Sequence, residues 1–220
     1  MRPGRGPRVH FSLRSPFSWM AIERLRREIP DAHDVVEFIP FWDPDPETER
    51  RLAARGGEFH YQQMSKAKHL YILHDTKRMA ARLKLDMRWP VDIDPWWEIP
   101  HLAFLKARDL GAEAAFYTEV TEARWTRGEN ICDPAVITAI EHRCGLDGAG
   151  LARTPDDSEL RERGVDCLFR AYEDDIFGIP YFRVGRERYW GLDRFDWFLA
   201  DLLRTLGDRR FDTDTAGGCG

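Results

Sequence analysis

Ser15 stands where a serine side chain can act on an anion. It follows residues 9–13, whose alternation of apolar and polar types predicts a short strand, and it precedes Pro16, a residue typical of the first helical position. At the N-terminus of a helix, backbone N–H groups and the helix dipole favour negative charge, and the hydroxyl can donate a hydrogen bond. Ser15 can also serve as a plain N-cap of the helix, and spacing alone favours that simpler role.

A second candidate segment lies near the other end of the sequence. Gly178-Ile179-Pro180 precedes a predicted strand, and a cis bond between Ile179 and Pro180 would expose the preceding backbone to a ligand. A trans turn is the simpler alternative, because only about 5–6% of X-Pro bonds in folded proteins are cis. Farther on, Asp193 either caps the last helix or accepts hydrogen bonds from an ammonium group of a ligand. These two roles of Asp193 do not exclude each other.

Aromatic residues form the third group of candidates. Tryptophans cluster in the middle of the chain and at the junctions with its flanking segments. Such side chains can wall an apolar pocket for an aromatic small molecule, although most tryptophans are core residues and packing explains them equally well. The predicted wall of the substrate pocket consists of Phe17, Trp19, Trp42, Trp96 and Trp97.

The cysteines and histidines point away from thiol and metal chemistry. The four cysteines, Cys132, Cys144, Cys167 and Cys219, form no Cys-x-x-Cys pair and are too widely spread for a disulfide framework. The seven histidines show no spacing typical of a structural zinc site. We therefore expect neither a redox motif nor a metal centre.

Composition excludes several broad classes of protein. The chain has 220 residues with 33 Lys+Arg and 38 Asp+Glu, a formal net charge of -5, so nucleic acid and anionic membranes are disfavoured as partners. With 43% hydrophobic residues the body is globular, and no apolar run reaches the roughly 18 residues of a membrane helix. The first residues also lack the apolar segment of a signal peptide. We expect a cytoplasmic protein.

The surrounding elements predict an α/β unit that is interrupted by helices. A strand at 9–13, a helix at 16–29 and a strand at 35–39 give a βαβ start, and strands at 181–184 and 188–190 with a helix from Asp193 to Gly207 give a ββα end. Between them the periodicity is helical at 75–85, 99–110, 112–127, 133–145 and 156–172. We therefore predict the first half of the α/β unit at 8–42, an all-helical insertion at 43–172, the second half at 173–207 and a flexible tail at 208–220.

Several short motifs, in their order along the chain, resemble the 2-hydroxychromene-2-carboxylate isomerases. They are Ser15-Pro16-Phe17-Ser18-Trp19, the segment 71–85 with Asp75, Asn130-Ile131-Cys132-Asp133-Pro134, Phe177-Gly178-Ile179-Pro180 and Tyr189-Trp190-Gly191-Leu192-Asp193-Arg194. These isomerases belong, with the kappa-class glutathione transferases, to the DsbA-like branch of the thioredoxin superfamily. The resemblance therefore implies a thioredoxin-like fold, βαβ–ββα, with an all-helical domain inserted between its halves.

The resemblance also implies a cofactor and a reaction. Ser15 stands where oxidoreductase relatives carry the first cysteine of Cys-x-x-Cys, and in glutathione-using members this serine stabilises the thiolate of the cofactor. Ile179, before the cis-proline Pro180, would pair with the peptide backbone of glutathione, and Leu192 and Asp193 would hold its γ-glutamyl end. The implied reaction is isomerisation of a conjugated aromatic carbonyl compound by thiolate addition, bond rotation and elimination. Homodimers are common in the family.

The sequence departs from the family in two places. The isomerases carry a lysine soon after the second strand, where this chain has Pro40-Phe41-Trp42-Asp43-Pro44. They also carry an asparagine in the early insertion, for which Gln62, Gln63 or Ser65 is only a loose replacement. The substrate is therefore open. The alternatives are a kappa-like glutathione transferase, a glutathione-independent enzyme acting on an aromatic polyketide or similar biosynthetic intermediate, and a non-catalytic binding protein.

Overall fold

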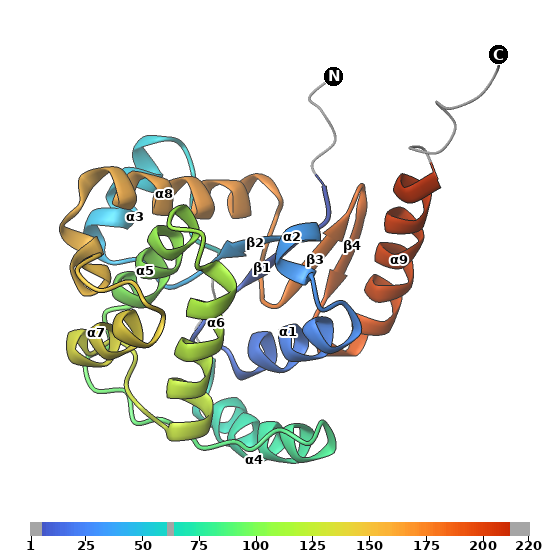
Figure 1. The fold of residues 1–220 in the computed structure, drawn as a ribbon, viewed down its shortest axis with the longest axis horizontal. Helices are drawn as coiled ribbons and strands as arrows, with labels where there is room; N and C mark the ends of the chain where they lie inside the picture. Colours follow the sequence, from blue (N-terminus) through green and yellow to red (C-terminus); the bar gives the residue numbers. More distant parts are fainter. Residues whose placement is uncertain (1–5, 61–63, 212–220) are drawn as a thin grey trace.

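A four-stranded mixed sheet lies at the centre of the computed structural model, which describes residues 6–60 and 64–211 (Figure 1). The strand order is β2-β1-β3-β4. β1 is parallel to β2 and antiparallel to β3, and β3 forms an antiparallel hairpin with β4, which confirms the predicted βαβ start and ββα end. The strands span Arg8–Phe11 (β1), Glu37–Pro40 (β2), Tyr181–Val184 (β3) and Glu187–Trp190 (β4).

The first helix begins where the sequence predicts. Ser15 is the N-cap of α1 (Pro16–Glu28), and its side-chain oxygen accepts a hydrogen bond from the N–H of Ser18 at 3.2 Å. A proline at the first helical position loses nothing there, because that N–H has no partner inside the helix. A short helix that the sequence pattern did not predict, α2 (Ala32–Val35), leads into β2.

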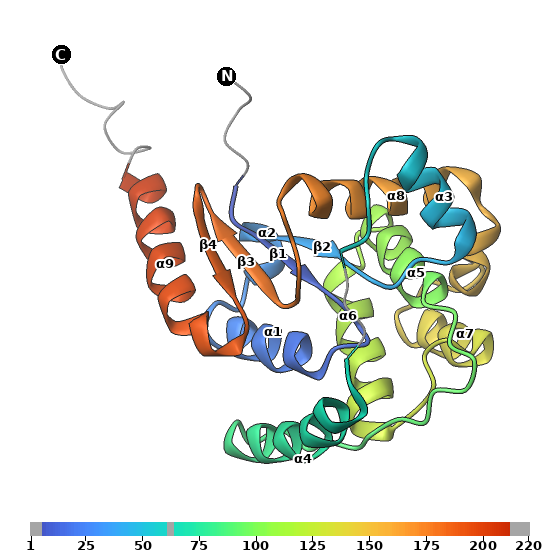
Figure 2. The same ribbon diagram turned by 180° about the vertical axis from the view of Figure 1, so that it is seen from behind.

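In the described residues, the regular elements between β2 and β3 are all helical. In Figure 1 and Figure 2, helices α3, α5, α7 and α8 gather beside the sheet on the side of β2, and α4 lies apart, below α1. α4 begins earlier than the predicted 75–85, because Ser65 caps it by accepting a hydrogen bond from Lys68 N at 3.3 Å. The elements are α3 (Pro46–Ala54), α4 (Lys66–Arg82), α5 (Glu98–Asp109), α6 (Glu113–Thr121), the π-helical turn η1 (Glu122–Arg127), α7 (Pro134–Arg143), the 3-10 helix η2 (Leu151–Asp156) and α8 (Ser158–Glu173).

The last helix differs from its predicted form at both ends. Asp193 does not cap it: this residue lies in a 3-10 helix, η3 (Leu192–Arg194), and its carboxylate pairs with Arg194 at 2.6 Å. α9 (Phe195–Phe211) continues past Gly207, where the pattern placed its end. A glycine inside a helix costs only about 1 kcal/mol relative to alanine, so it does not by itself stop the helix. Residues 212–220 of the predicted tail lie outside the described part of the chain.

The two faces of the sheet differ in chemistry. One face is apolar, and on it Phe182 of β3 stacks on Phe198 of α9 at 4.3 Å between ring centroids. On the other face, Asp174 at the end of α8 receives hydrogen bonds from Arg8 Nε at 2.9 Å and from His10 Nε2 at 3.2 Å. Although burial opposes it, these hydrogen bonds hold the pKa of Asp174 well below its usual range. Within the described residues, no helix is both long and apolar enough to cross a membrane.

Candidate functional site

The sheet brings three distant segments of the chain to one edge. The carbonyl of Phe11, the last residue of β1, accepts a hydrogen bond at 2.7 Å from the N–H of Phe41, just after β2. His10 lies opposite Tyr181 in the antiparallel register of β1 and β3, so continuing this register brings the turn after β1 abreast of Ile179. This edge is formed by the carboxyl ends of the parallel strands, where ligands bind in α/β sheets.

Ser15 is partly exposed at this edge. Its Oγ accepts the hydrogen bond from Ser18 N, and a serine hydroxyl that accepts one hydrogen bond can still donate its own hydrogen. The first turn of α1 contains no acidic residue that would neutralise the positive end of the helix dipole. Among the described residues, no backbone carbonyl outside α1 accepts a hydrogen bond from the N–H of Phe17 in that turn. Ser15 is thus a helix cap, as spacing favoured, and an anion placed beside it would also meet a hydroxyl, an amide and the dipole.

A buried histidine holds the turn that carries Ser15. His101 of α5 lies with Nδ1 at 2.7 Å from the carbonyl oxygen of Trp97, which assigns the proton to Nδ1 and leaves Nε2 as an acceptor. Nε2 lies 3.1 Å from the backbone N of Leu13 and 3.2 Å from Oγ of Ser12. Two consecutive residues of the turn are therefore fixed by one imidazole that is distant in sequence.

Acid is expected to destabilise the fold through this histidine. Burial lowers the pKa of His101 from 6.5 to about 3. The unfolded chain then binds a proton that the folded chain does not, so stability falls as the pH drops from about 6.5 towards about 3. The slope from His101 is about 1.4 kcal/mol per pH unit, and urea unfolding curves measured across this range check it. A His101→Gln variant should show a shallower slope, and equal slopes in the two proteins would contradict a neutral, buried His101.

The bond between Ile179 and Pro180 is cis, so the trans alternative is wrong. The carbonyl of Pro180 accepts a hydrogen bond from Gly191 N at 2.9 Å, which joins the start of β3 to the end of β4. For Ile179 itself, no backbone hydrogen bond is recorded within residues 6–60 and 64–211. Its side chain packs on the main core. The backbone of Ile179 can therefore pair with a peptide-like ligand.

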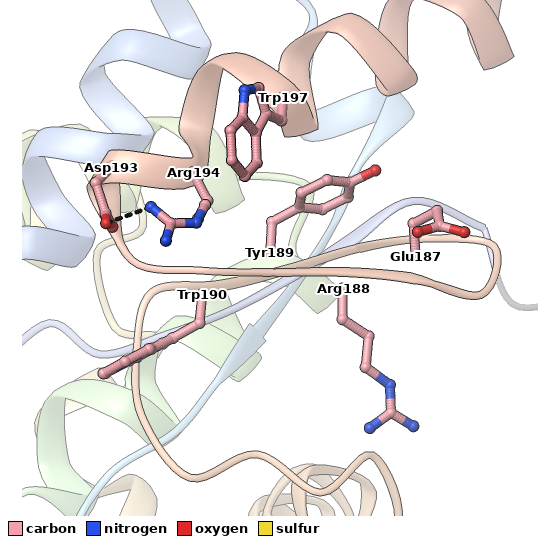
Figure 3. Close-up of a pocket in the computed structure, with 7 residues that line it drawn as sticks. All are labelled: Glu187, Arg188, Tyr189, Trp190, Asp193, Arg194 and Trp197. Atoms are coloured by element: carbon pink, nitrogen blue, oxygen red, sulfur yellow. Dashed lines mark hydrogen bonds and ion pairs between the residues drawn. The ribbon is translucent and has the colours of Figure 1, made fainter.

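Asp193 lies at a cavity of about 370 Å³ between β4 and the start of α9 (Figure 3). Its side chain is 73% exposed, and Arg194, its ion-pair partner, also lies 5.0 Å from the centroid of the Trp197 ring. Leu192 packs both on the main core and on the cluster that contains Trp19. The cavity wall thus combines an exposed carboxylate, guanidinium groups and indole rings.

Three of the predicted pocket aromatics lie in the core. Trp42 and Trp97 are 2% and 5% exposed, and Trp42 stacks on the imidazole of His101 at 5.0 Å. Trp19 is 5% exposed and stacks on Trp125 at 5.7 Å. Core and pocket wall use the same residue types, so the sequence could not distinguish them. These rings support the turn and α1, and almost none of their surface is left for a substrate.

The other two predicted pocket residues are more open. Phe17 is partly buried against the cluster around Trp19. Trp96 is 39% exposed, and its indole N–H donates a hydrogen bond to Asp45 at 3.0 Å. Contacts of Phe17 and Trp96 with a substrate stay predictions.

An exposed aromatic pair beside the cis bond was not among the predicted pocket residues. Phe177 and Trp190 are 55% and 52% exposed and meet edge to face at 5.0 Å. A Cβ at Gly178 would lie only 2.6 Å from Nε1 of Trp190, so the absence of a side chain there lets the indole cover the loop. Both aromatic residues stand in the quoted motifs, but nothing in the sequence marked them as exposed. His101 carried no signal either, because its partners lie far away in sequence.

The surroundings of the buried cysteines disfavour ionised thiols. Burial raises the pKa of Cys132 to about 12 and that of Cys167 to about 11, so neither thiol ionises readily. The three cysteines of the described chain, including Cys144, are unpaired, and Cys219 lies outside it. No group of three or more histidine, cysteine, aspartate or glutamate side chains able to hold a metal ion occurs in that part of the chain.

Comparison with known proteins identifies the family. The model described as DSBA-like thioredoxin domain matches residues 8–203. The 2-hydroxychromene-2-carboxylate isomerase of Sphingobium xenophagum is 27% identical over 201 residues, which cover 88% of this chain and 96% of that protein. The isomerase of the same name from Pseudomonas putida is 22% identical over 185 residues, covering 84% and 88%. A solved structure of a 2-hydroxychromene-2-carboxylate isomerase has a TM-score of 0.72 at 21% identity, covering 96% of this chain and 100% of that one. This α/β chain, with a thioredoxin-like sheet and helices between its halves, belongs to the DsbA-like thioredoxin family.

Proposed function

We propose that this protein is a glutathione-dependent isomerase of a conjugated aromatic carbonyl compound. Relatives that match most of the chain carry the name 2-hydroxychromene-2-carboxylate isomerase, which supports this reaction class. The observation that carries the proposal is Ser15, a partly exposed residue at the N-terminus of α1 whose hydroxyl accepts from Ser18 N and can still donate a hydrogen bond. A serine cannot form a disulfide, so this position supports binding of an external thiolate and not thiol–disulfide exchange.

Three further residues, Ile179, Leu192 and Asp193, support the proposal that the ligand is glutathione. The backbone N–H and C=O of Ile179, next to the cis bond, pair with no other backbone group in the described chain and suit an extended peptide backbone. Asp193 is an exposed carboxylate beside a cavity, which suits the ammonium group of a γ-glutamyl end. Leu192, packed on two cores, would hold this segment in place.

Ser15 would act by holding a sulfur atom in its anionic form. A cysteine-like thiol has a pKa of about 8.5, so only a few per cent of it is ionised at neutral pH, and lowering that pKa by about 2 units requires about 2.7 kcal/mol of differential stabilisation. A donated hydrogen bond to a charged acceptor and the dipole of α1 together have that order of magnitude. When bound, glutathione would supply a thiolate that adds to an electron-poor carbon of the substrate and leaves again after rotation about the former double bond.

The aromatic part of the substrate has a candidate surface next to the same backbone. Phe177 and Trp190 expose their rings beside Ile179, and edge-to-face or stacked contacts with an aromatic ring are favourable. These two residues therefore join Phe17 and Trp96 as proposed substrate contacts.

Turnover of 2-hydroxychromene-2-carboxylate with millimolar glutathione tests the proposal. We expect a product of unchanged mass and a constant amount of glutathione, measured by chromatography and thiol titration. Formation of a stable thioether with loss of one glutathione per product would instead identify a kappa-like transferase. Equal turnover without glutathione would overturn the cofactor assignment and favour a glutathione-independent enzyme. Unaltered substrate, with or without glutathione, would overturn this isomerase proposal for the named substrate.

A further inference from the structure

Arg14 is a half-exposed arginine directly before Ser15. Its side chain is 44% exposed, and the guanidinium forms an ion pair with Asp43, whose side chain is 34% exposed. The guanidinium carbon also lies 5.6 Å from the centroid of the Trp97 ring. Trp97 is almost fully buried next to His101, so it is a fixed surface against which the arginine rests. Arg14 follows β1 and Asp43 follows β2, so the positive charge lies at the edge formed by the carboxyl ends of these two parallel strands.

The ion pair between Arg14 and Asp43 is suited to exchange. Exposed ion pairs contribute little net stability, because solvent screens them and ordering both side chains costs entropy. Within the described part of the chain, Arg14 is the partner recorded for the Asp43 carboxylate. The nearby Asp45 differs: it accepts hydrogen bonds from Thr48 N at 2.8 Å and from Arg161 at 2.9 Å, so it is fixed from two sides.

A guanidinium group matches the geometry of a carboxylate, with parallel N–H donors in one plane. Asp43 shows that a carboxylate can reach Arg14, through a contact between Nη1 of Arg14 and Oδ2 of Asp43. A carboxylate of a ligand could take the same place, because Asp43 is partly exposed and can turn toward water. Asp43 would then weaken ligand binding by competing for the guanidinium.

We propose that Arg14 is the carboxylate-binding residue of this site and that Asp43 is the internal carboxylate which a ligand displaces. The inference rests on the proposed function, because it takes the ligand beside Ser15 to be anionic. The shared chemistry is a carboxylate, and its source is either the aromatic substrate or the glycine end of glutathione. In both cases Arg14 selects ligands by charge, and Ser15 acts on the sulfur.

Two variants that remove the same ion pair separate this role from a structural one. Arg14→Gln and Asp43→Asn both break the pair, so a merely structural bridge predicts the same change in both. Carboxylate recognition predicts opposite changes: Arg14→Gln should weaken ligand binding at least about 10-fold, the usual scale for a lost charged hydrogen bond, and Asp43→Asn should strengthen it. Thermal unfolding of both variants checks that they fold alike.

Calorimetric binding of two probes shows the source of the carboxylate. The first is 2-naphthoate, compared with its uncharged primary amide, and the second is glutathione. Opposite changes for naphthoate and none for the amide assign Arg14 to the substrate, and opposite changes for glutathione assign it to the tripeptide. Parallel changes in the two variants, no change, or no binding of either probe to the wild type would overturn the proposal. Because this readout needs no turnover, it stands apart from the isomerase assay, and its failure leaves the assay of the proposed function intact.

Discussion

Ser15→Ala is expected to lower kcat/KM with glutathione about 100-fold below neutral pH. There the fraction of thiolate depends directly on the thiol pKa, and losing about 2 units of pKa depression costs about two orders of magnitude. The difference should shrink as the pH rises from about 6.5 to about 8.5 and nearly vanish above that, where a cysteine-like thiol ionises without help. A pH profile of kcat/KM therefore separates this role from simple loss of folded protein.

Ser15 also caps α1, so the alanine variant needs a control for stability. Replacing an N-cap serine by alanine costs about 0.5–2 kcal/mol. Ser15→Asp is the matched variant, because aspartate is a good N-cap but its carboxylate repels a thiolate. We expect Ser15→Asp to unfold at nearly the wild-type temperature and to be at least as inactive as Ser15→Ala. Wild-type turnover by either variant would show that the hydroxyl has no part in the reaction.

His101→Phe is expected to reduce the free energy of unfolding by about 2–6 kcal/mol. The ring can still stack on Trp42, but the N–H of Leu13 and the hydroxyl of Ser12 lose their acceptor inside the protein. A buried donor left without a partner costs about 1–3 kcal/mol, and two are stranded here. Urea unfolding at neutral pH measures the loss.

A double variant tests whether these hydrogen bonds are the cause. Ser12→Ala removes one of the two donors, so Ser12→Ala combined with His101→Phe should be less destabilised than the sum of the single variants. Strict additivity would mean that the cost comes from ring packing and not from the stranded hydroxyl. Turnover by folded His101→Phe should also fall, since the turn that positions Ser15 is no longer fixed.

The expected acid sensitivity and the expected loss of stability in His101→Phe have the same structural cause. A neutral imidazole in the core is needed as an acceptor, and protonation would replace that acceptor with a second donor. We therefore expect the position of Ser15 to depend on a fully buried side chain. Second-layer hydrogen bonds of this kind commonly determine how precisely a site is held.

Local patterns were sufficient for the elements that begin and end the chain. Alternation over residues 9–13 and the two short runs at 181–184 and 188–190 predicted strands, and the Ser15-Pro16 pair predicted a capped helix, because each pattern depends on neighbours in sequence. The predictions failed at the two ends of α9, where the local rules express only weak preferences. Asp193 pairs with Arg194 instead of capping, and α9 runs through Gly207 because one glycine is too weak a stop.

The sequence by itself determined the fold class and the place of Ser15 at a helix N-terminus, since both follow from periodicity and the order of short motifs. Only the tertiary structure decided which aromatic rings are open, that the Ile179–Pro180 bond is cis, and that His101 holds the turn. The physical reason is that burial and hydrogen bonds between distant segments depend on the packing of the whole chain. The sequence does not distinguish a tryptophan in the core from a tryptophan on the surface. Residues 12 and 101 become neighbours only when the helices between the two halves fold onto the sheet.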